Sequence, residues 1–378
     1  MKKTVLDHIP EHIRKLSPYV PGKAIRQAER ESGTAVIKLA SNENPFGPSP
    51  LAREAIRRAA QQVNRYPDVD AGELRAALAS LHDLPLEHIF IADGSLGILD
   101  ILARTLLAPG LNAVSGERSF ISYPLVTRAA GAKYVTAPMR RHSYHLDGIL
   151  GAIDENTRVV YLANPNNPTG TMFDADACEA FLSRVPEDVL VVLDEAYFDF
   201  AQDFAAQRGI TYSRSLEQVR RGRANLLVLR TFSKVHGLAG LRIGYGCGDP
   251  EFLKYLGRIR NAFSISAVAE AAALAALRDT AHIHRTIENN AAGARWLAAR
   301  LAEMSVQPVP TSANFFYFEV DEDADAFAQR MQAEGVIVRS LVPWDIPNGI
   351  RVSIGTPEQN EEFVRVFKKV GRRDLVIG

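Results

Sequence analysis

The sequence predicts an α/β protein with a large domain, built on a mostly parallel sheet covered by helices, and a smaller α+β domain. Between residues 44 and 256, short apolar runs alternate with amphipathic helical patterns, as is typical of a wound parallel sheet. Three runs, 159–162, 189–193 and 226–229, are almost wholly apolar. Such runs indicate parallel strands that helices cover on both faces.

The sequence pattern changes after Pro250. Residues 252–301 are rich in alanine and predict helices. Strand and helix patterns then alternate through 314–320, 323–335, 336–338 and 350–354. We therefore expect an N-terminal arm with part of the small domain at 1–45, a large domain at 46–255 and a small C-terminal domain at 256–378.

The composition argues against several classes of partner. Lys plus Arg and Asp plus Glu both number 44, so the formal net charge is zero and neither nucleic acid nor an anionic membrane is indicated. The cysteines, Cys178 and Cys247, suggest no disulfide framework, and no His, Cys and carboxylate cluster suggests a metal. With no apolar span or signal-peptide pattern, we expect a cytoplasmic protein that acts on small molecules.

A polar group follows each of the three apolar strands. The turn 164–170 supplies amides, Asp194 ends the second run, and Lys234 lies just beyond the third. Taken singly, each has a plain structural explanation: a tight turn, a helix cap or ion pair, and a lysine that extends to solvent. Parallel sheets, however, bind ligands beyond the carboxyl ends of their strands.

A phosphate site is also indicated early in the chain. The strand 89–92 leads through Gly94 and Ser95 into a helix expected at 96–107. Backbone N–H groups at a helix start bind phosphate, although Ser95 could equally act as a plain N-cap. Ser233 could add a hydroxyl and Arg242 a guanidinium.

Together these groups fit one cofactor chemistry. Pyridoxal phosphate needs an amine for its aldehyde, a carboxylate for its pyridine nitrogen, donors for its ring oxygen and a site for its phosphate. These groups occur in chain order as Asn167, Asp194, Tyr197, Lys234 and Arg242.

Motifs along nearly the whole chain resemble the fold-type-I, pyridoxal-phosphate-dependent aminotransferases, and within them the histidinol-phosphate aminotransferase family. They occupy 39–45, 64–67, 164–170, 194–197, 231–234, 240–244, 335–339 and 349–355. One departure is Leu96-Gly97, where the family commonly has an acidic residue after Gly-Ser. A second is extra length between Asp199 and Asn225, whose basic residues we expect on a solvated surface.

The resemblance implies roles for the site residues. Lys234 would form the Schiff base and move the proton at the substrate Cα, and Asp194 would pair with the pyridine nitrogen. Contacts to the rest of the cofactor would come from Asn167 and Tyr197 at the ring oxygen, Phe120 on the ring face, and Ser95, Leu96, Ser233 and Arg242 at the phosphate. Tyr66 would reach the phosphate from the neighbouring subunit, which makes the enzyme a homodimer.

The resemblance also implies the substrates. The alternation of residues 350–354 places Arg351 and Ser353 on one face of a strand. Without the resemblance, either Arg351 or Arg339 could simply be a charged residue on the surface of a strand. In the family, residues matching Tyr19, Asn44, Arg339 and Arg351 bind substrate. The expected reaction is therefore ping-pong transfer of an amino group between L-histidinol phosphate and 2-oxoglutarate, a step of histidine biosynthesis.

Three alternatives stay open. An aromatic-amino-acid aminotransferase would use the same residues with Arg351 on a carboxylate. A threonine-phosphate decarboxylase would release carbon dioxide. A non-catalytic regulatory module that binds pyridoxal phosphate is disfavoured by the intact Lys234 and by the lack of a recognisable DNA-binding segment at either terminus.

Overall fold

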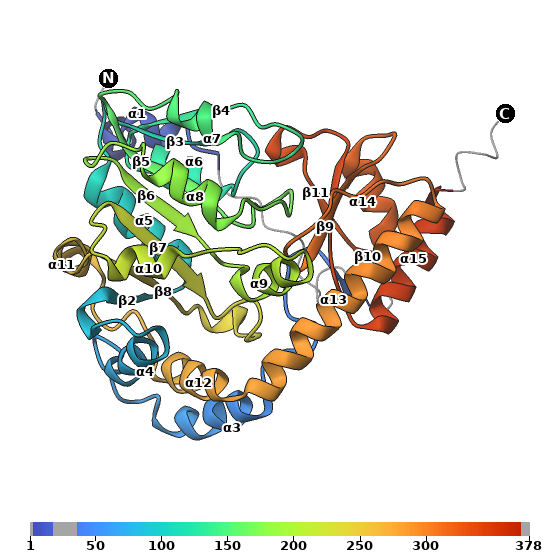
Figure 1. The fold of residues 1–378 in the computed structure, drawn as a ribbon, viewed down its shortest axis with the longest axis horizontal. Helices are drawn as coiled ribbons and strands as arrows, with labels where there is room; N and C mark the ends of the chain where they lie inside the picture. The colour runs from blue at the N-terminus through green and yellow to red at the C-terminus, as the bar shows by residue number, and fades with distance from the viewer. Residues whose placement is uncertain (1–2, 18–35, 372–378) are drawn as a thin grey trace.

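A seven-stranded sheet forms the centre of the larger part of the molecule (Figure 1). The computed structural model describes residues 3–17 and 36–371. In spatial order the strands are β2 (Ile89–Ala92), β8 (Gly244–Gly248), β7 (Leu226–Thr231), β6 (Leu190–Asp194), β5 (Thr157–Ala163), β3 (Asn112–Gly116) and β4 (Lys133–Ala137). Strand β8 is antiparallel to both its neighbours, and the pairs from β7 to β4 are parallel. The predicted mostly parallel sheet is confirmed.

Alternate residues of the central strands pack into two separate cores, because successive side chains of a strand point to opposite faces. One core takes Val160 and Leu162 of β5, and the other takes Val159 and Tyr161. Helices cover both faces, as the wholly apolar strands predict. The helices of this larger part of the molecule are α3 (Pro50–Ala59), α4 (Gly72–His82), α5 (Ser95–Leu106), α6 (Ser122–Ala129), α7 (Leu146–Leu150), α8 (Ala175–Leu182), α9 (Phe198–Gln207), α10 (Ser215–Arg220), α11 (Pro250–Ile259) and α12 (Ala267–Arg278).

The C-terminal part is the α+β unit that the sequence predicts. An antiparallel sheet contains β11 (Arg339–Ser340), β12 (Gly349–Ser353) and β9 (Phe315–Glu319), and a parallel pair joins β1 (Ile37–Lys38) to β10 (Val336–Ile337). The helices beside them are α13 (Thr280–Glu303), α14 (Ala324–Ala333) and α15 (Pro357–Gly371). Their shared core contains Phe318, Val352 and Phe363, together with Leu39 from the N-terminal segment.

Helix α12 packs with the large core rather than with this unit. Its alanines, among them Ala269, Ala272 and Ala276, lie in the same cluster as the β6 and β7 side chains, and α12 contacts α3 and α4. Helix α13 then runs from this region to the C-terminal unit (Figure 1). The division at residues 45 and 255 stays a prediction.

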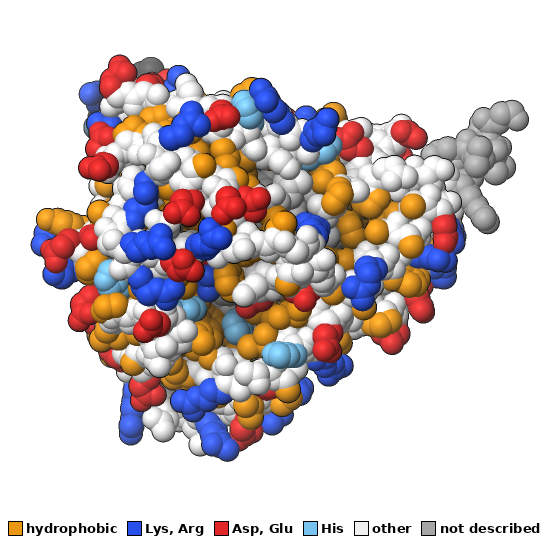
Figure 2. All heavy atoms as spheres, in the orientation of Figure 1, with side chains coloured by type: hydrophobic (Ala, Val, Ile, Leu, Met, Phe, Trp, Pro, Cys, Tyr) orange, Lys and Arg blue, Asp and Glu red, His pale blue; other side chains and the backbone are white. Residues whose placement is uncertain are grey.

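Short elements complete the described chain: α1 (Glu11–Arg14), η1 (Val5–His8), η2 (Ala60–Gln62), η3 (Leu86–His88), η4 (Ala239–Leu241) and η5 (Val342–Trp344). Among the residues described, no helix has the length and apolar character needed to span a membrane. On the face drawn in Figure 2, basic and acidic side chains are interspersed. This arrangement agrees with the formal net charge of zero.

Candidate active site

A cavity of about 200 Å³ lies where β5, β6 and β7 end and α5 begins. The residues that line it come from segments far apart in the sequence. They are Ser95, Leu96, Phe120, Ala163, Pro165, Asn167, Asp194, Ala196, Tyr197, Thr231, Ser233, Lys234, Ala239 and Arg242. The amide, acid and amine that follow the three apolar strands therefore meet in one cavity, at the sheet edge where they were expected.

The acid of the cavity is Asp194, the last residue of β6. Its carboxylate accepts hydrogen bonds from the Tyr123 hydroxyl at 3.1 Å and from the Ala196 N–H at 3.2 Å. Burial raises the pKa of Asp194 to about 6, and these hydrogen bonds and the nearby Lys234 only partly oppose that rise. A buried carboxylate of this kind is suited to hold a cationic partner.

The amine is Lys234, which follows the end of β7 at Thr231. Its Nζ donates to the Ser41 carbonyl at 3.5 Å, a long contact, and lies 5.3 Å from the centre of the Tyr197 ring. This ammonium forms no ion pair with a carboxylate of the described residues, and it lines the cavity.

Two neighbours orient the donors on the cavity wall. The Tyr197 hydroxyl accepts from Asn42 Nδ2 at 3.0 Å, so its own hydrogen can be donated to another acceptor. The Asn167 Oδ1 accepts from Arg351 Nη1 at 2.5 Å. With the amide oxygen bound, the amide nitrogen of Asn167 is the end that can donate into the cavity.

The start of α5 forms a site for an anion. The N–H groups of Ser95 and Leu96 belong to the first helical turn, which has no intrahelical acceptors. Gly94 (φ +90°) lies so close to Arg242 that a Cβ at residue 94 would stand 2.5 Å from the guanidinium. Arg242 itself contacts the Asp93 carbonyl at 3.4 Å. Backbone donors and a guanidinium converge here as phosphate recognition requires.

An arginine pair lies beside this cavity. Arg339 and Arg351 are direct cross-strand partners in β11 and β12. The Trp344 ring lies 5.3 Å from the Arg339 guanidinium and 5.9 Å from that of Arg351. Its indole N–H donates to the Ser119 carbonyl at 2.8 Å, next to Phe120 in the cavity wall.

The comparisons with known proteins agree with this geometry. The family model "Aminotransferase class I and II" matches residues 34–367. "Histidinol-phosphate aminotransferase 2" of Pseudomonas fluorescens (strain Pf0-1) is 42% identical over 361 residues, which cover 95% of this chain and 96% of the relative. The histidinol-phosphate aminotransferase of Moorella thermoacetica is 41% identical over 361 residues, 95% of this chain and 92% of the relative.

The chain belongs to the histidinol-phosphate aminotransferase family. Among solved structures, it is similar to the histidinol-phosphate aminotransferase from Sinorhizobium meliloti in complex with pyridoxal-5′-phosphate, with a TM-score of 0.88, 29% identity and 98% of each chain covered. The predicted fold type and the predicted class, a pyridoxal-phosphate-dependent aminotransferase, are confirmed. The described residues contain no group of His, Cys, Asp and Glu that could hold a metal.

Four described residues expected at the site are not in the cavity lining: Arg339 and Arg351, which lie beside it, and Tyr66 and Asn44. Tyr66 is 84% exposed and packs against Phe263, with ring centroids 4.7 Å apart. Asn44 is buried, and its Nδ2 donates to the Val235 carbonyl at 2.8 Å and to the Thr286 hydroxyl at 3.2 Å. Tyr19 lies outside the described residues. Their substrate and cofactor roles stay predictions.

Sequence reasoning missed three residues that support the aminotransferase cavity: Asn42, Tyr123 and Trp344. Asn42 lies inside the 39–45 motif and Tyr123 lies three residues after Phe120, so their positions were visible but their contacts were not. Trp344 is one of two tryptophans in the chain. Its place between Arg339 and Arg351, five residues beyond the first of them, was the available signal.

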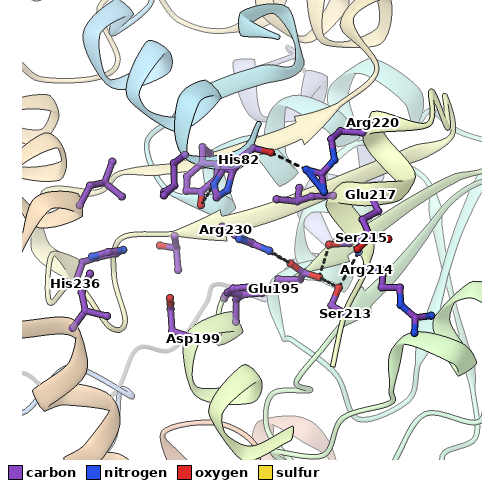
Figure 3. A pocket seen from close by; sticks show the side chains of 18 of the residues that line it. His82, Glu195, Asp199, Ser213, Arg214, Ser215, Glu217, Arg220, Arg230 and His236 are labelled. Carbon is purple, nitrogen blue, oxygen red and sulfur yellow. Dashed lines mark hydrogen bonds and ion pairs between the residues drawn. The ribbon is translucent and has the colours of Figure 1, made fainter. Parts of the chain in front are cut away.

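A second cavity, of about 480 Å³, lies on the other side of Ala196 and Thr231, which line both cavities. Its wall contains the buried ion pair between Glu195 and Arg230, 2.8 Å apart (Figure 3). Ser213 and Ser215 donate to the other oxygen of Glu195 at 2.6 and 2.7 Å. The extra segment after Asp199 thus supplies part of this wall. Arg220 and Arg221 are exposed as predicted, but Arg223, expected on the same surface, is half-buried and donates to the Leu182 carbonyl.

Proposed function

We propose that this enzyme transfers the amino group between L-histidinol phosphate and 2-oxoglutarate by a ping-pong mechanism, as a step of histidine biosynthesis in the cytoplasm. The observation that carries the substrate assignment is the cross-strand pair Arg339 and Arg351 beside the cavity. The names of relatives 39–43% identical over nearly the whole chain support the same substrate.

The arginine pair is an argument for an anionic substrate. Like charges directly opposite each other in an antiparallel sheet are destabilising, so their juxtaposition favours an anion between them. A phosphate and a carboxylate both fit a guanidinium fork. The same pair can therefore serve the phosphate of one substrate and a carboxylate of the other.

The cavity residues fit pyridoxal phosphate by their chemistry. Asp194 supplies a buried carboxylate for the pyridine nitrogen, and Asn167 and Tyr197 supply oriented donors for the ring oxygen. Ser95, Leu96, Ser233 and Arg242 surround the place for its phosphate. Phe120 lines the wall from which it can cover the ring face. When bound, the cofactor supplies an electron sink for the bonds at the substrate Cα.

The chain's own groups then divide the work. Lys234 would hold the cofactor through its amine, and the same amine would move the proton at the substrate Cα. Asp194 holds the proton at the pyridine nitrogen. Arg351 binds the substrate anion and, through its hydrogen bond to Asn167, also orients a donor to the ring oxygen.

We propose further that the enzyme works as a homodimer in which Tyr66 reaches the phosphate site of the partner subunit. Two observations support this. Tyr66 is 84% exposed, whereas tyrosines are usually partly buried, and it does not line the cavity of its own chain. The exposed pair of Tyr66 and Phe263 would then be covered by the second copy.

The test is a panel of half-reactions with the purified holoenzyme. We expect L-histidinol phosphate to discharge the visible absorbance of the bound cofactor in a single turnover, and 2-oxoglutarate to restore it. Borohydride reduction followed by peptide mapping should place the adduct on Lys234. A fast half-reaction with phenylalanine and none with histidinol phosphate would instead assign an aromatic aminotransferase. Carbon dioxide released from threonine phosphate would assign a decarboxylase, and no reaction with any of them a non-catalytic module.

A further inference from the structure

The carboxylate of Asp194 contacts one member of a stacked pair of fully buried tyrosines. Tyr123 of α6 and Tyr161 of β5 stack with ring centroids 4.7 Å apart and planes 7° apart. The Tyr123 hydroxyl donates to Asp194 Oδ2 at 3.1 Å. The Tyr161 hydroxyl is also buried but makes no hydrogen bond to Asp194; its polar neighbour is the Thr127 hydroxyl, with which it forms no well-aligned hydrogen bond. Only one of two adjacent, similar phenols therefore contacts the acid.

Tyr123 touches the aromatic wall of the cavity as well. Its ring meets that of Phe120 edge to face, with centroids 5.5 Å apart and an interplanar angle of 89°. Stacking on Tyr161 fixes the ring plane, so the hydroxyl has little freedom to leave Asp194. One side chain thus positions both the acid and the aromatic of the proposed cofactor site.

We infer that Tyr123 is a positioning residue that keeps Asp194 ionised and directed into the cavity. A hydrogen bond to a carboxylate favours its charged form, against the burial that favours the neutral form. Burial also raises the pKa of Tyr123 far above its ordinary value, so the phenol stays protonated and remains a donor. The inference rests on the proposed cofactor role of Asp194 and is independent of the substrate.

The other ionisable groups around Asp194 act on it in known directions. Lys234 favours the charged carboxylate, whereas Glu195 disfavours it. Glu195 is in turn paired with Arg230. Tyr144 is a half-buried residue, and burial of its phenol raises its pKa to about 12, so this group is neutral. Tyr123 is the one neutral side chain among these that donates to the carboxylate.

The test replaces Tyr123 by phenylalanine and uses Tyr161→Phe as a matched control. Both changes remove one buried phenol oxygen from the same stack, but only the first removes a hydrogen bond to Asp194. In full-length apoprotein with ¹³C-labelled aspartate, NMR follows the Asp194 carboxyl, assigned with Asp194→Asn. Tyr123→Phe should raise its titration midpoint by about one pH unit. Because the ionised acid is the form that pairs with the cofactor, affinity for pyridoxal phosphate should fall about 2-fold at pH 7 and nearly 10-fold at about pH 5. Tyr161→Phe should change neither quantity.

A second variant keeps the test decisive if Tyr123→Phe does not fold. Site-specific 3-fluorotyrosine at residue 123 is a stronger donor of nearly the same shape, and it should lower the Asp194 midpoint. The inference is overturned if the midpoint is unmoved in a folded Tyr123 variant, or if the Tyr161 variant moves it equally. If Asp194→Asn binds the cofactor like the unaltered protein, the proposed role of Asp194 fails instead, a separable result.

Discussion

Arg351 of β12 donates from Nη1 to Oδ1 of Asn167, which follows β5, at 2.5 Å. A residue of the small sheet is thus bonded directly to the turn that ends a strand of the large one. The same guanidinium donates from Nη2 to the Ala40 carbonyl at 2.8 Å. Under the proposed function, substrate recognition and cofactor orientation would share this one side chain.

Replacing either arginine of the pair should impair both substrates. We expect Arg351→Ala to lower kcat/KM for histidinol phosphate and for 2-oxoglutarate by about 10²-fold or more, since a charge-assisted hydrogen bond contributes about 1.5–3 kcal/mol. Arg339→Ala should act in the same direction. Arg365→Ala, an exposed arginine of α15 paired with Glu362, serves as control. Steady-state kinetics that show loss for only one of the two substrates would contradict a shared anion site.

Removing the amine should abolish catalysis while sparing the fold. For Lys234→Ala we expect kcat to fall by about 10³-fold or more, because both the covalent attachment and the proton transfer are lost. No borohydride-stable adduct should form. The exposed Lys254 gives a matched control, Lys254→Ala, which should keep both activity and adduct. Retained turnover in the Lys234 variant would refute the assignment of this lysine.

A mixed dimer tests whether Tyr66 acts on the partner's site. Tyr66→Ala and Lys234→Ala chains, each impaired alone, should regain about half of one dimer's activity when recombined, because one of the two sites then has both native residues. If Tyr66 served its own chain, recombination would restore nothing. Differently tagged subunits, purified as the hybrid and assayed against both parents, provide the measurement.

The buried carboxylate predicts a specific pH dependence of stability for the apoprotein. The pKa of Asp194 is raised to about 6, so between about pH 4 and pH 6 the native state binds a proton that the unfolded state releases. Stability should therefore fall as pH rises through this window, by up to about 3 kcal/mol. Urea unfolding of the protein and of Asp194→Asn across this range isolates the contribution. Equal pH profiles of the two would contradict the raised pKa.

Removing one charge of the buried Glu195–Arg230 ion pair should destabilise the protein strongly. Glu195→Gln leaves the buried Arg230 without its anion, and we expect a loss of about 3–5 kcal/mol in unfolding free energy. Glu217→Gln, at a partly exposed acid that lines the same second cavity, should change stability by less than about 0.5 kcal/mol. Urea midpoints of the two variants, measured with cofactor present, decide the matter. Similar losses in both would argue against a special role for the buried pair.

The sequence predicts the strands that build the site because their composition and their environment agree. Apolar runs give β5, β6 and β7 to within a residue or two at each end, and the rule for parallel sheets predicts where Asn167, Asp194 and Lys234 meet. Strand β8 could not be predicted in this way, because its sequence is rich in glycine and contains no apolar run. Its glycines reflect crowding, since a Cβ at Gly244 would stand 2.8 Å from the Ser95 nitrogen.

The supporting contacts could not be predicted from local patterns. Tyr123 reaches Asp194 across 71 positions of sequence, and Trp344 reaches Ser119 across 225. No periodicity or spacing reports such a pairing, because it is set by the packing of elements that are distant in the chain. The hydrogen bonds from the Asn44 amide to Val235 and Thr286 are likewise contacts that its sequence position does not report.

Asn42, in a left-handed conformation (φ 55°), joins three parts of the molecule. Besides Tyr197, it contacts the Ser353 hydroxyl through its N–H at 2.8 Å and accepts from Asn314 at its carbonyl. A shortened chain that began at Glu43 would retain every side chain lining the cavity and still lack the group that aims the tyrosine. Trimming the amino terminus for expression or crystallisation should accordingly stop well before this asparagine.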